Sequence, residues 1–228
     1  MNNKAFALLT TAALSYSIVP TWYYKSRQRL HHHPNGEKTL YLTFDDGPDA
    51  WYTPELLDLL EQYDIPASFF VVAESAHAFP EIISRMKQNG HVIGLHSLAH
   101  KNGLIQPPVS VCRDFAHSTA ILQNLGVPPQ YFRPPWGHWN VVSTIQAHRY
   151  GMQPMLWDVM AEDWRGDTTA SEIAHKLLTR TFDGAIICLH DGRGKNHAPA
   201  RTIAALRRVL PQWLDAGYHF ETVAHYDT

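Results

Sequence analysis

The sequence predicts an α/β fold in which seven strand-then-helix units form a mainly parallel sheet. Two observations lead to this prediction. From Lys38 onward, short apolar runs alternate with longer segments of helical period, which is the pattern of consecutive βα units. Several helical segments are followed by the glycine that commonly ends a helix, namely Gly90, Gly126, Gly151 and Gly217.

The elements follow one another in a regular order after residue 38. We expect strands at residues 39–44, 67–72, 91–95, 130–132, 153–157, 184–189 and 218–223. We expect helices between them at residues 53–63, 79–89, 109–125, 140–149, 168–181 and 198–216. Pro54 and Pro80 stand in first helical turns, where proline is tolerated. Residues 38–228 therefore read as one domain without an internal repeat.

The composition is typical of one globular domain. The chain has 228 residues, of which 45% are hydrophobic and 18% charged, so it can bury one sizeable core. The formal net charge is −2 without long blocks of one sign, which argues against nucleic-acid binding. The two cysteines are too few for a disulfide framework or a Cys-rich zinc site. Alternation with His190 turns Cys188 towards the barrel interior, whereas Cys112 lies on an outer helix, so we expect no disulfide.

The N-terminal segment resembles a membrane anchor. Residues 5–24 carry no charge, and this length is about what a helix needs to cross a bilayer core. Aromatic and then basic residues follow at positions 22–29, as at a membrane interface. We expect residues 1–30 to be a hydrophobic anchor or leader helix at a membrane or cell envelope, on a side that the sequence leaves open. A cleaved signal peptide and a leader helix packed on the domain are the alternatives. Residues 31–37 should form a solvated linker.

Polar side chains follow the predicted strands at their carboxyl ends. They are Asp45, Asp46, His96, Arg133, Asp158 and His190. In a parallel barrel these ends open on one face, where loops build the site. One such residue could be an ordinary strand cap, but five strands of seven ending in this way predict a common site.

Two motifs carry metal-binding chemistry. Asp45 and Asp46 are adjacent carboxylates, which repel each other unless a cation or a shared proton compensates. The alternative is a plain Asp-Asp-Gly-Pro turn. His96 and His100 are spaced i and i+4, so on a helical turn both imidazoles could reach one ion. Two histidines and one carboxylate form the ligand pattern of hydrolytic zinc sites.

Two further motifs suggest transition-state and proton chemistry. The prolines between Arg133 and Trp136 hold the backbone extended, which would aim the arginine and the Trp136 N–H as an oxyanion donor requires. A rigid loop whose arginine pairs with a surface acid is the alternative. His190 follows a strand near a carboxylate, where it could deliver a proton to a leaving amine. The alternative for His190 is a core histidine whose ring nitrogens are hydrogen-bonded within the fold and have no catalytic role.

Five ordered motifs together resemble the polysaccharide deacetylase family, also called the NodB-homology or carbohydrate esterase family 4 enzymes. They are TFDDG at residues 43–47, HSLAH at 96–100, RPPWG at 133–137, the Asp163-Trp164 pair and Leu189-His190. The resemblance covers residues 38–223. It implies a distorted (β/α)7 barrel, similar to a TIM barrel, and metal-dependent hydrolysis of N-acetyl groups on amino sugars.

The resemblance assigns roles by position. Asp45 matches the general base and His190 the general acid. The metal ligands of the family match three residues, namely Asp46, His96 and His100. The ion is expected to be zinc, with cobalt and nickel also compatible with this ligand set.

Four more positions match supporting residues of the family. Arg133 matches the residue that orients the base, and the backbone N–H of Trp136 matches the oxyanion donor. Asp163 matches the partner that tunes the acid, and Trp164 matches a wall of the pocket. Two departures concern the rim, because Met160 stands where many relatives carry an acidic residue and Trp136 stands where a tyrosine is common.

The resemblance therefore implies a hydrolase that removes N-acetyl groups from N-acetylglucosamine-type residues of a glycan, either a chitin oligomer or a peptidoglycan-like polymer. Metal-bound water would attack the acetamide, with Asp45 as base and His190 as acid. The expected partners are this glycan and one metal ion, with no nucleic acid, and the chain should be a monomer.

Two alternative functions remain open at this point, and a third is excluded. A cyclic amide or ureide hydrolase of the same family would use a related site. A non-catalytic carbohydrate-binding module would need Trp136, Trp139 and Trp164 for stacking. A glycoside hydrolase needs two carboxylates about 5–9.5 Å apart across a sugar, which the adjacent Asp45 and Asp46 do not provide.

Overall fold

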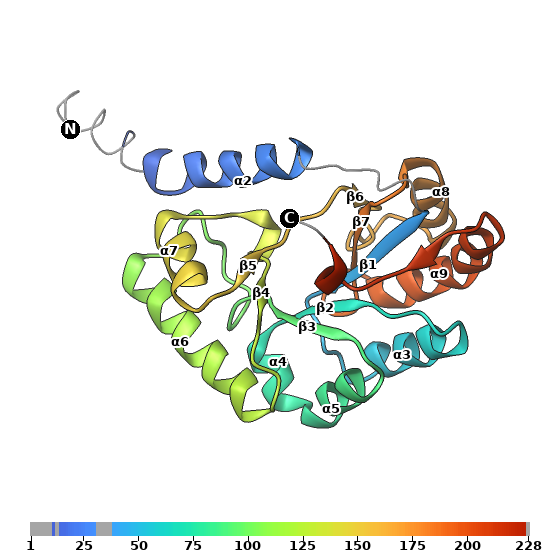
Figure 1. Ribbon diagram of the computed structural model, residues 1–228, viewed down its shortest axis with the longest axis horizontal. Helices are drawn as coiled ribbons and strands as arrows, with labels where there is room; N and C mark the ends of the chain where they lie inside the picture. Colours follow the sequence, from blue (N-terminus) through green and yellow to red (C-terminus); the bar gives the residue numbers. More distant parts are fainter. Residues whose placement is uncertain (1–10, 12–13, 31–37, 227–228) are drawn as a thin grey trace.

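The computed structural model describes residues 11, 14–30 and 38–226. Within these residues, eight strands form one sheet in the order β5-β4-β3-β2-β1-β7-β6, and β8 pairs with the start of β1. All the pairings are parallel. The strands are β1 (Thr39–Asp45), β2 (Ser68–Val71), β3 (Val92–Leu95), β4 (Tyr131–Phe132), β5 (Gln153–Pro154), β6 (Val159–Met160), β7 (Ile186–His190) and β8 (His219–Phe220). As predicted, the sheet is a distorted barrel (Figure 1). It is open between the two end strands of this order, β5 and β6.

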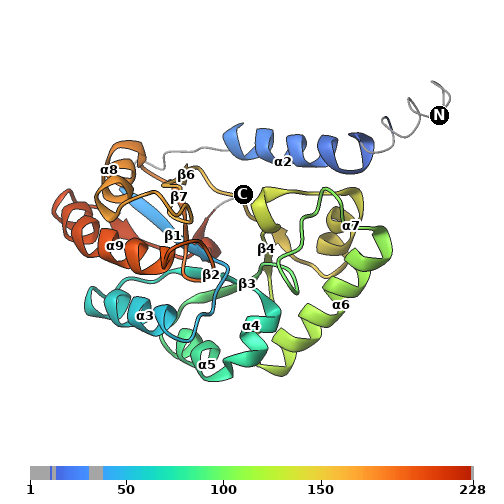
Figure 2. The same ribbon diagram turned by 180° about the vertical axis from the view of Figure 1, so that it is seen from behind.

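Helices surround the outside of this sheet (Figures 1 and 2). They are α3 (Tyr52–Gln62), α4 (Ala73–Ala78), α5 (Pro80–Gln88), α6 (Pro108–Asn124), α7 (Val141–Arg149), α8 (Ala170–Arg180) and α9 (Ala198–Asp215). Capping boxes fix where two of them begin, with Asn140 and Ser143 at α7 and Thr169 and Glu172 at α8. The apolar faces of these helices and the buried strands make up the main core.

The central strand β1 explains how the sheet presents the site. All seven of its residues are buried, as expected for a strand covered on both faces. It pairs with β2 on one side and with β7 on the other, and Asp45 at its end lies opposite His190 of β7. The carboxyl ends of the longest strands therefore bring these two side chains together.

Two elements differ from the sequence prediction. The sequence predicts one strand at residues 153–157. The structure has the two-residue strand β5 there (Gln153–Pro154), and a separate strand β6 follows at Val159–Met160. Pro154 accounts for the short strand, because proline has no N–H to continue a ladder. The helix α4 at Ala73–Ala78 was not predicted, since six residues are too few to display a helical period.

The N-terminal segment packs against the domain over the part that is described. After the π-helical turn η1 (Leu14–Ile18), helix α2 (Val19–Leu30) lies along the side of the molecule between α7 and β6 (Figures 1 and 2). Tyr24 stacks on the buried Trp139 with 4.1 Å between ring centroids. Thr21 Oγ1 donates to the carbonyl of Trp139 and accepts from its N–H, at 2.9 and 2.8 Å. These contacts match the alternative of a leader helix packed on the domain.

The predicted membrane attachment through residues 5–24 falls partly outside the described residues. In the part of the chain that the structure describes, no helix is both long enough and apolar enough to span a bilayer. The linker predicted at residues 31–37 also lies outside the described residues. The boundaries between the anchor or leader segment (residues 1–30), the linker (31–37) and the domain (38–228) therefore stay predictions.

Candidate metal and acid-base site

A cavity of about 1020 Å³ opens at the carboxyl ends of the strands. The predicted site residues that line it are Asp45, Asp46, His96, His100, Trp136, Trp164 and His190. Arg133 and Asp163 lie directly behind this lining and are fully buried. Residues from five separate stretches of the chain therefore meet at one place. Four of the stretches follow strands and match that prediction, whereas the Asp163-Trp164 pair was indicated only by the family resemblance.

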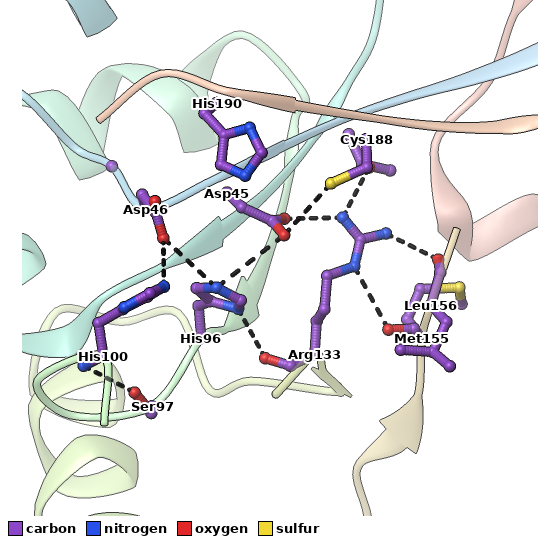
Figure 3. Close-up of polar contacts among 12 residues, drawn as sticks. Asp45, Asp46, His96, Ser97, His100, Arg133, Met155, Leu156, Cys188 and His190 are labelled. Carbon is purple, nitrogen blue, oxygen red and sulfur yellow. Dashed lines mark hydrogen bonds and ion pairs between the residues drawn. The ribbon is translucent and has the colours of Figure 1, made fainter. Parts of the chain in front are cut away.

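Asp46, His96 and His100 form one cluster (Figure 3). Asp46 Oδ1 lies 2.9 Å from His100 Nε2 and 3.4 Å from His96 Nε2. Burial by itself would raise the pKa of Asp46, but the two imidazoles outweigh it and hold the pKa well below the usual range. The carboxylate is therefore ionised.

The cluster is built by a loop and not by a helical turn. Residues 96–100 follow β3 without helical structure, and Ser97 and His100 have left-handed backbones with φ of 69° and 55°. Ser97 Oγ accepts a hydrogen bond from the N–H of His100 at 2.9 Å. The helical rationale for the His96 and His100 spacing is therefore wrong, although both imidazoles still reach Asp46.

The orientation of His96 is set by a backbone contact. Its Nδ1 lies 2.7 Å from the carbonyl oxygen of Arg133. Because a carbonyl only accepts, Nδ1 carries a proton, and this contact turns Nε2 towards Asp46. The imidazole is thus arranged as a ligand.

Asp45 is held by a buried arginine. Arg133 Nη1 donates to Asp45 Oδ1 at 2.7 Å and to Thr43 Oγ1 at 2.7 Å, and the remaining donors reach two carbonyls at 2.9 and 3.3 Å. The guanidinium lies 4.0 Å from the ring centroid of Phe70. The partner of Arg133 is therefore the carboxylate in the cavity, which excludes the alternative of a surface ion pair. The other oxygen of Asp45, Oδ2, lies 3.9 Å from His96 Nε2.

His190 carries a proton that Asp163 stabilises. Its Nδ1 lies 2.9 Å from Asp163 Oδ1, and its backbone N–H donates to Asp163 Oδ2 at 2.9 Å. Thr202 Oγ1 also donates to Asp163 Oδ2, at 2.8 Å. Burial would lower the pKa of His190, but the charge of Asp163 and its hydrogen bond raise the pKa to about 9. The ring of Trp164 stands edge-on to this imidazole with centroids 5.5 Å apart.

Asp191 supports the site in a way that the sequence did not reveal. Its Oδ2 accepts from Thr53 Oγ1 at 2.7 Å and its Oδ1 accepts from the N–H of Gly47 at 3.2 Å. Burial raises the pKa of Asp191 to about 7. The side chain therefore ties the end of β7 to the loop that carries Asp46.

Two expectations need correction. Asp158 does not end a strand at the cavity, because it precedes β6 and its carboxylate accepts from the N–H of Ile186 at 2.9 Å and from Gln28 Nε2 at 3.1 Å. Trp139, which a carbohydrate-binding module would need for stacking, is fully buried under Tyr24. Only Trp136 and Trp164 of that set line the cavity.

Both cysteines lie where the sequence predicted. Cys188 is buried and lines the cavity, whereas Cys112 is exposed, and neither forms a disulfide. Burial raises the pKa of the Cys188 thiol, which donates to Asp45 Oδ2 with 3.4 Å between the atoms.

Part of the cavity rim was not predicted from the sequence. The basic residues Arg165, Arg193 and Lys195 line the cavity from loops. No spacing signal marks them, because they do not follow strand ends.

Comparisons with known proteins agree with this arrangement. A model of the polysaccharide deacetylase family matches residues 32–155. A peptidoglycan-N-acetylglucosamine deacetylase of Bacillus cereus is 33% identical over 193 residues, covering 84% of this chain and 89% of that protein. A chitooligosaccharide deacetylase of Bradyrhizobium sp. is 30% identical over 194 residues, covering 81% of this chain and 88% of that protein.

Solved structures share the fold. A crystal structure of a peptidoglycan N-acetylglucosamine deacetylase superposes with a TM-score of 0.79 at 31% identity, covering 85% of this chain and 89% of that one. A family 4 acetyl xylan esterase from Clostridium thermocellum, in complex with a cobalt ion, gives a TM-score of 0.75 at 32% identity, covering 83% and 90%.

Fold and site together define a hydrolase built on a distorted parallel α/β barrel. The chain belongs to the polysaccharide deacetylase family, the carbohydrate esterase family 4 enzymes. It is a hydrolase that acts on carbon-nitrogen bonds other than peptide bonds.

The contact between Gly47 and Asp191 gives a stability prediction. The backbone of Gly47 is one that alanine can adopt, but an added Cβ would overlap the carboxylate of Asp191. We expect Gly47→Ala to lower the free energy of unfolding in urea by about 1–3 kcal/mol, as overpacking does. In the double variant Gly47→Ala/Asp191→Ala, the combined loss should be smaller than the sum of the two single losses. Additive losses would show that the two groups do not collide.

Proposed function

We propose that this protein removes N-acetyl groups from N-acetylglucosamine residues of an envelope glycan, with a divalent metal ion as cofactor. The observation that carries the proposal is one cavity that holds a ligand set, a carboxylate held by a buried arginine and a protonated acid within reach of one another. The relatives named above as peptidoglycan-N-acetylglucosamine and chitooligosaccharide deacetylases support the choice of substrate. An envelope glycan implies action in the cell envelope.

The ligand set fits a zinc-type ion. In a tetrahedral site with metal-ligand bonds of about 2.0–2.1 Å, neighbouring ligand atoms are about 3.3 Å apart. The distances of 2.9 and 3.4 Å from Asp46 Oδ1 to the two imidazole nitrogens are close to that spacing. Asp46 Oδ1 is also buried without a hydrogen bond of ordinary geometry from the described residues. We infer that Asp46, His96 and His100 hold the ion, and that zinc occupies the site.

Asp45 acts as the base in this proposal. When bound, the ion polarises the acetamide carbonyl and lowers the pKa of a coordinated water. Arg133 holds Asp45 Oδ1, so Oδ2 faces the cavity and can take the proton of the attacking water. The fixed guanidinium keeps the carboxylate in position without rearrangement during the reaction.

His190 acts as the acid. Asp163 holds its Nδ1, which leaves Nε2 as the nitrogen that can donate a proton to the departing amine of the sugar. The backbone N–H of Trp136 would stabilise the oxyanion, and Trp164 would form one wall for the sugar. A module that only binds carbohydrate would have no use for both a base and an acid, which favours the enzyme.

Acetate release tests the proposed function. We expect the purified protein to release acetate from N-acetylglucosamine oligomers or from peptidoglycan fragments. Acetate release should stop after chelation of the metal and should return when zinc is restored. Acetate release that persists after complete removal of metal would contradict the metal-dependent route. Absence of release from both substrates in the zinc-loaded protein would contradict the assigned reaction.

Variants can separate the base from the ligands. Asp45→Asn should keep the metal and lose about 10²–10⁴-fold in kcat, because the proton acceptor is gone. His96→Ala should lose the metal itself, as measured by metal analysis after dialysis. His117→Ala, which removes an exposed histidine of α6, is the matched control and should keep both. Undiminished turnover in Asp45→Asn would remove Asp45 from the role of base.

The pKa of His190 predicts a pH effect. Activity that needs protonated His190 is present below its pKa and is lost as the pH rises through that value. Because Asp163 raises this pKa, Asp163→Asn should move the alkaline limb of the kcat/KM profile to lower pH. Asp58→Asn removes an exposed carboxylate of α3 and should leave the limb in place. An unchanged alkaline limb in Asp163→Asn would show that another group sets it.

A further inference from the structure

A second group of metal-ligating side chains stands beside the first. Asp45, Cys188 and His190 each offer one ligand atom, and these atoms lie within 4.8 Å of one another. None of the three belongs to the cluster of Asp46, His96 and His100. Both groups line the same cavity, so ions and water from solvent reach each of them.

Strand pairing brings the three ligand atoms together. Cys188 and His190 are two residues apart on β7, so both point to the same face of the sheet. Asp45 on β1 lies directly opposite His190, and Cys188 lies opposite Thr43. Figure 3 shows the thiol and the imidazole on either side of the Asp45 carboxylate. The arrangement is therefore built into two buried strands and does not depend on loops.

Each residue keeps one ligand atom for an ion once the Cys188 thiol and Nε2 of His190 have lost their protons. Asp45 Oδ1 is taken by Arg133, and Oδ2 accepts only the weak hydrogen bond of the Cys188 thiol, at 3.4 Å. His190 Nδ1 is taken by Asp163, which leaves Nε2. The carboxylates of Asp46 and Asp163 also lie near His190, and their negative charges favour a cation there.

We propose that Asp45, Cys188 and His190 bind a second, thiophilic divalent ion, such as cadmium or zinc in excess. The S–H bond of Cys188 breaks as the metal-sulfur bond forms, and the N–H bond at Nε2 of the protonated His190 breaks as that nitrogen binds the ion. Both protons leave to bulk water without any change of oxidation state. The ion then occupies the place of the thiol proton between Sγ and Oδ2. A sulfur, nitrogen and oxygen donor set suits zinc and cadmium and disfavours magnesium, and water from the cavity can complete the shell.

This second ion is inhibitory. The consequence rests on the proposed function, in which Asp45 Oδ2 accepts a proton and His190 Nε2 donates one. An ion at the second site would coordinate both atoms and remove the base and the acid together. Acetate release should therefore rise with the first equivalent of metal and fall by about 10²-fold or more when the second site fills.

Cadmium titration of the full chain tests the second site. The protein is loaded with one equivalent of zinc and titrated with cadmium chloride. Metal analysis after dialysis counts the bound ions, and ultraviolet absorbance records thiolate-to-cadmium charge transfer. We expect one additional ion, a charge-transfer band that grows with it, and a parallel loss of acetate release. Magnesium chloride should produce none of these changes. Binding of cadmium without the band would overturn the inference, as would a band without loss of acetate release.

Two cysteine variants assign the sulfur. Cys188→Val should abolish the band and the additional ion, whereas Cys112→Ser, which removes the exposed thiol, should keep both. Because the chain has two cysteines, a band in Cys112→Ser identifies Cys188 even if Cys188→Val does not fold. Loss of the band in Cys112→Ser would overturn the inference. A zinc-loaded protein that releases no acetate would contradict the proposed function, and the metal count and the band would still decide the second site.

Discussion

The buried ion pair between Arg133 and Asp45 is the interaction on which the rest of the site depends. The guanidinium fixes Asp45 Oδ1 at 2.7 Å, and the backbone carbonyl of the same arginine fixes Nδ1 of His96 at 2.7 Å. One residue at the end of β4 therefore orients both the proposed base and a proposed metal ligand. Removing one partner of such a pair would leave an uncompensated buried charge, which typically costs about 3–5 kcal/mol.

The same constraint explains how two adjacent carboxylates take different roles. Asp45 ends β1 and turns to Arg133, whereas Asp46 has a left-handed backbone with φ of 78° and turns to His96 and His100. Each carboxylate thus has its own cationic or metal-ligating partners, and the repulsion expected from their adjacency is offset. His190 approaches from the neighbouring strand, where pairing in register sets it opposite Asp45.

Sequence patterns predicted the sheet and most of the site, because both follow from periodicity and from the rule that parallel strands end on one face. They did not predict where the chain leaves that periodicity. The left-handed residues that bring His100 to Asp46 have no signal in the spacing of the histidines. Asp158 follows an apolar run, which predicted a strand that ends at the cavity. The strand β5 instead ends at Pro154, and the carboxylate of Asp158 accepts a hydrogen bond from the N–H of Ile186. Asp191 was overlooked because its role depends on Gly47 and Thr53, which are distant in sequence.

The central claim is that Asp46, His96 and His100 converge on one ion. Anomalous diffraction at the zinc absorption edge, from crystals of the protein grown with one equivalent of zinc, tests it most directly. The account predicts a single strong peak within about 2.0–2.2 Å of Asp46 Oδ1 and of Nε2 in both histidines. A peak elsewhere, or one to which His100 does not bind, would contradict it.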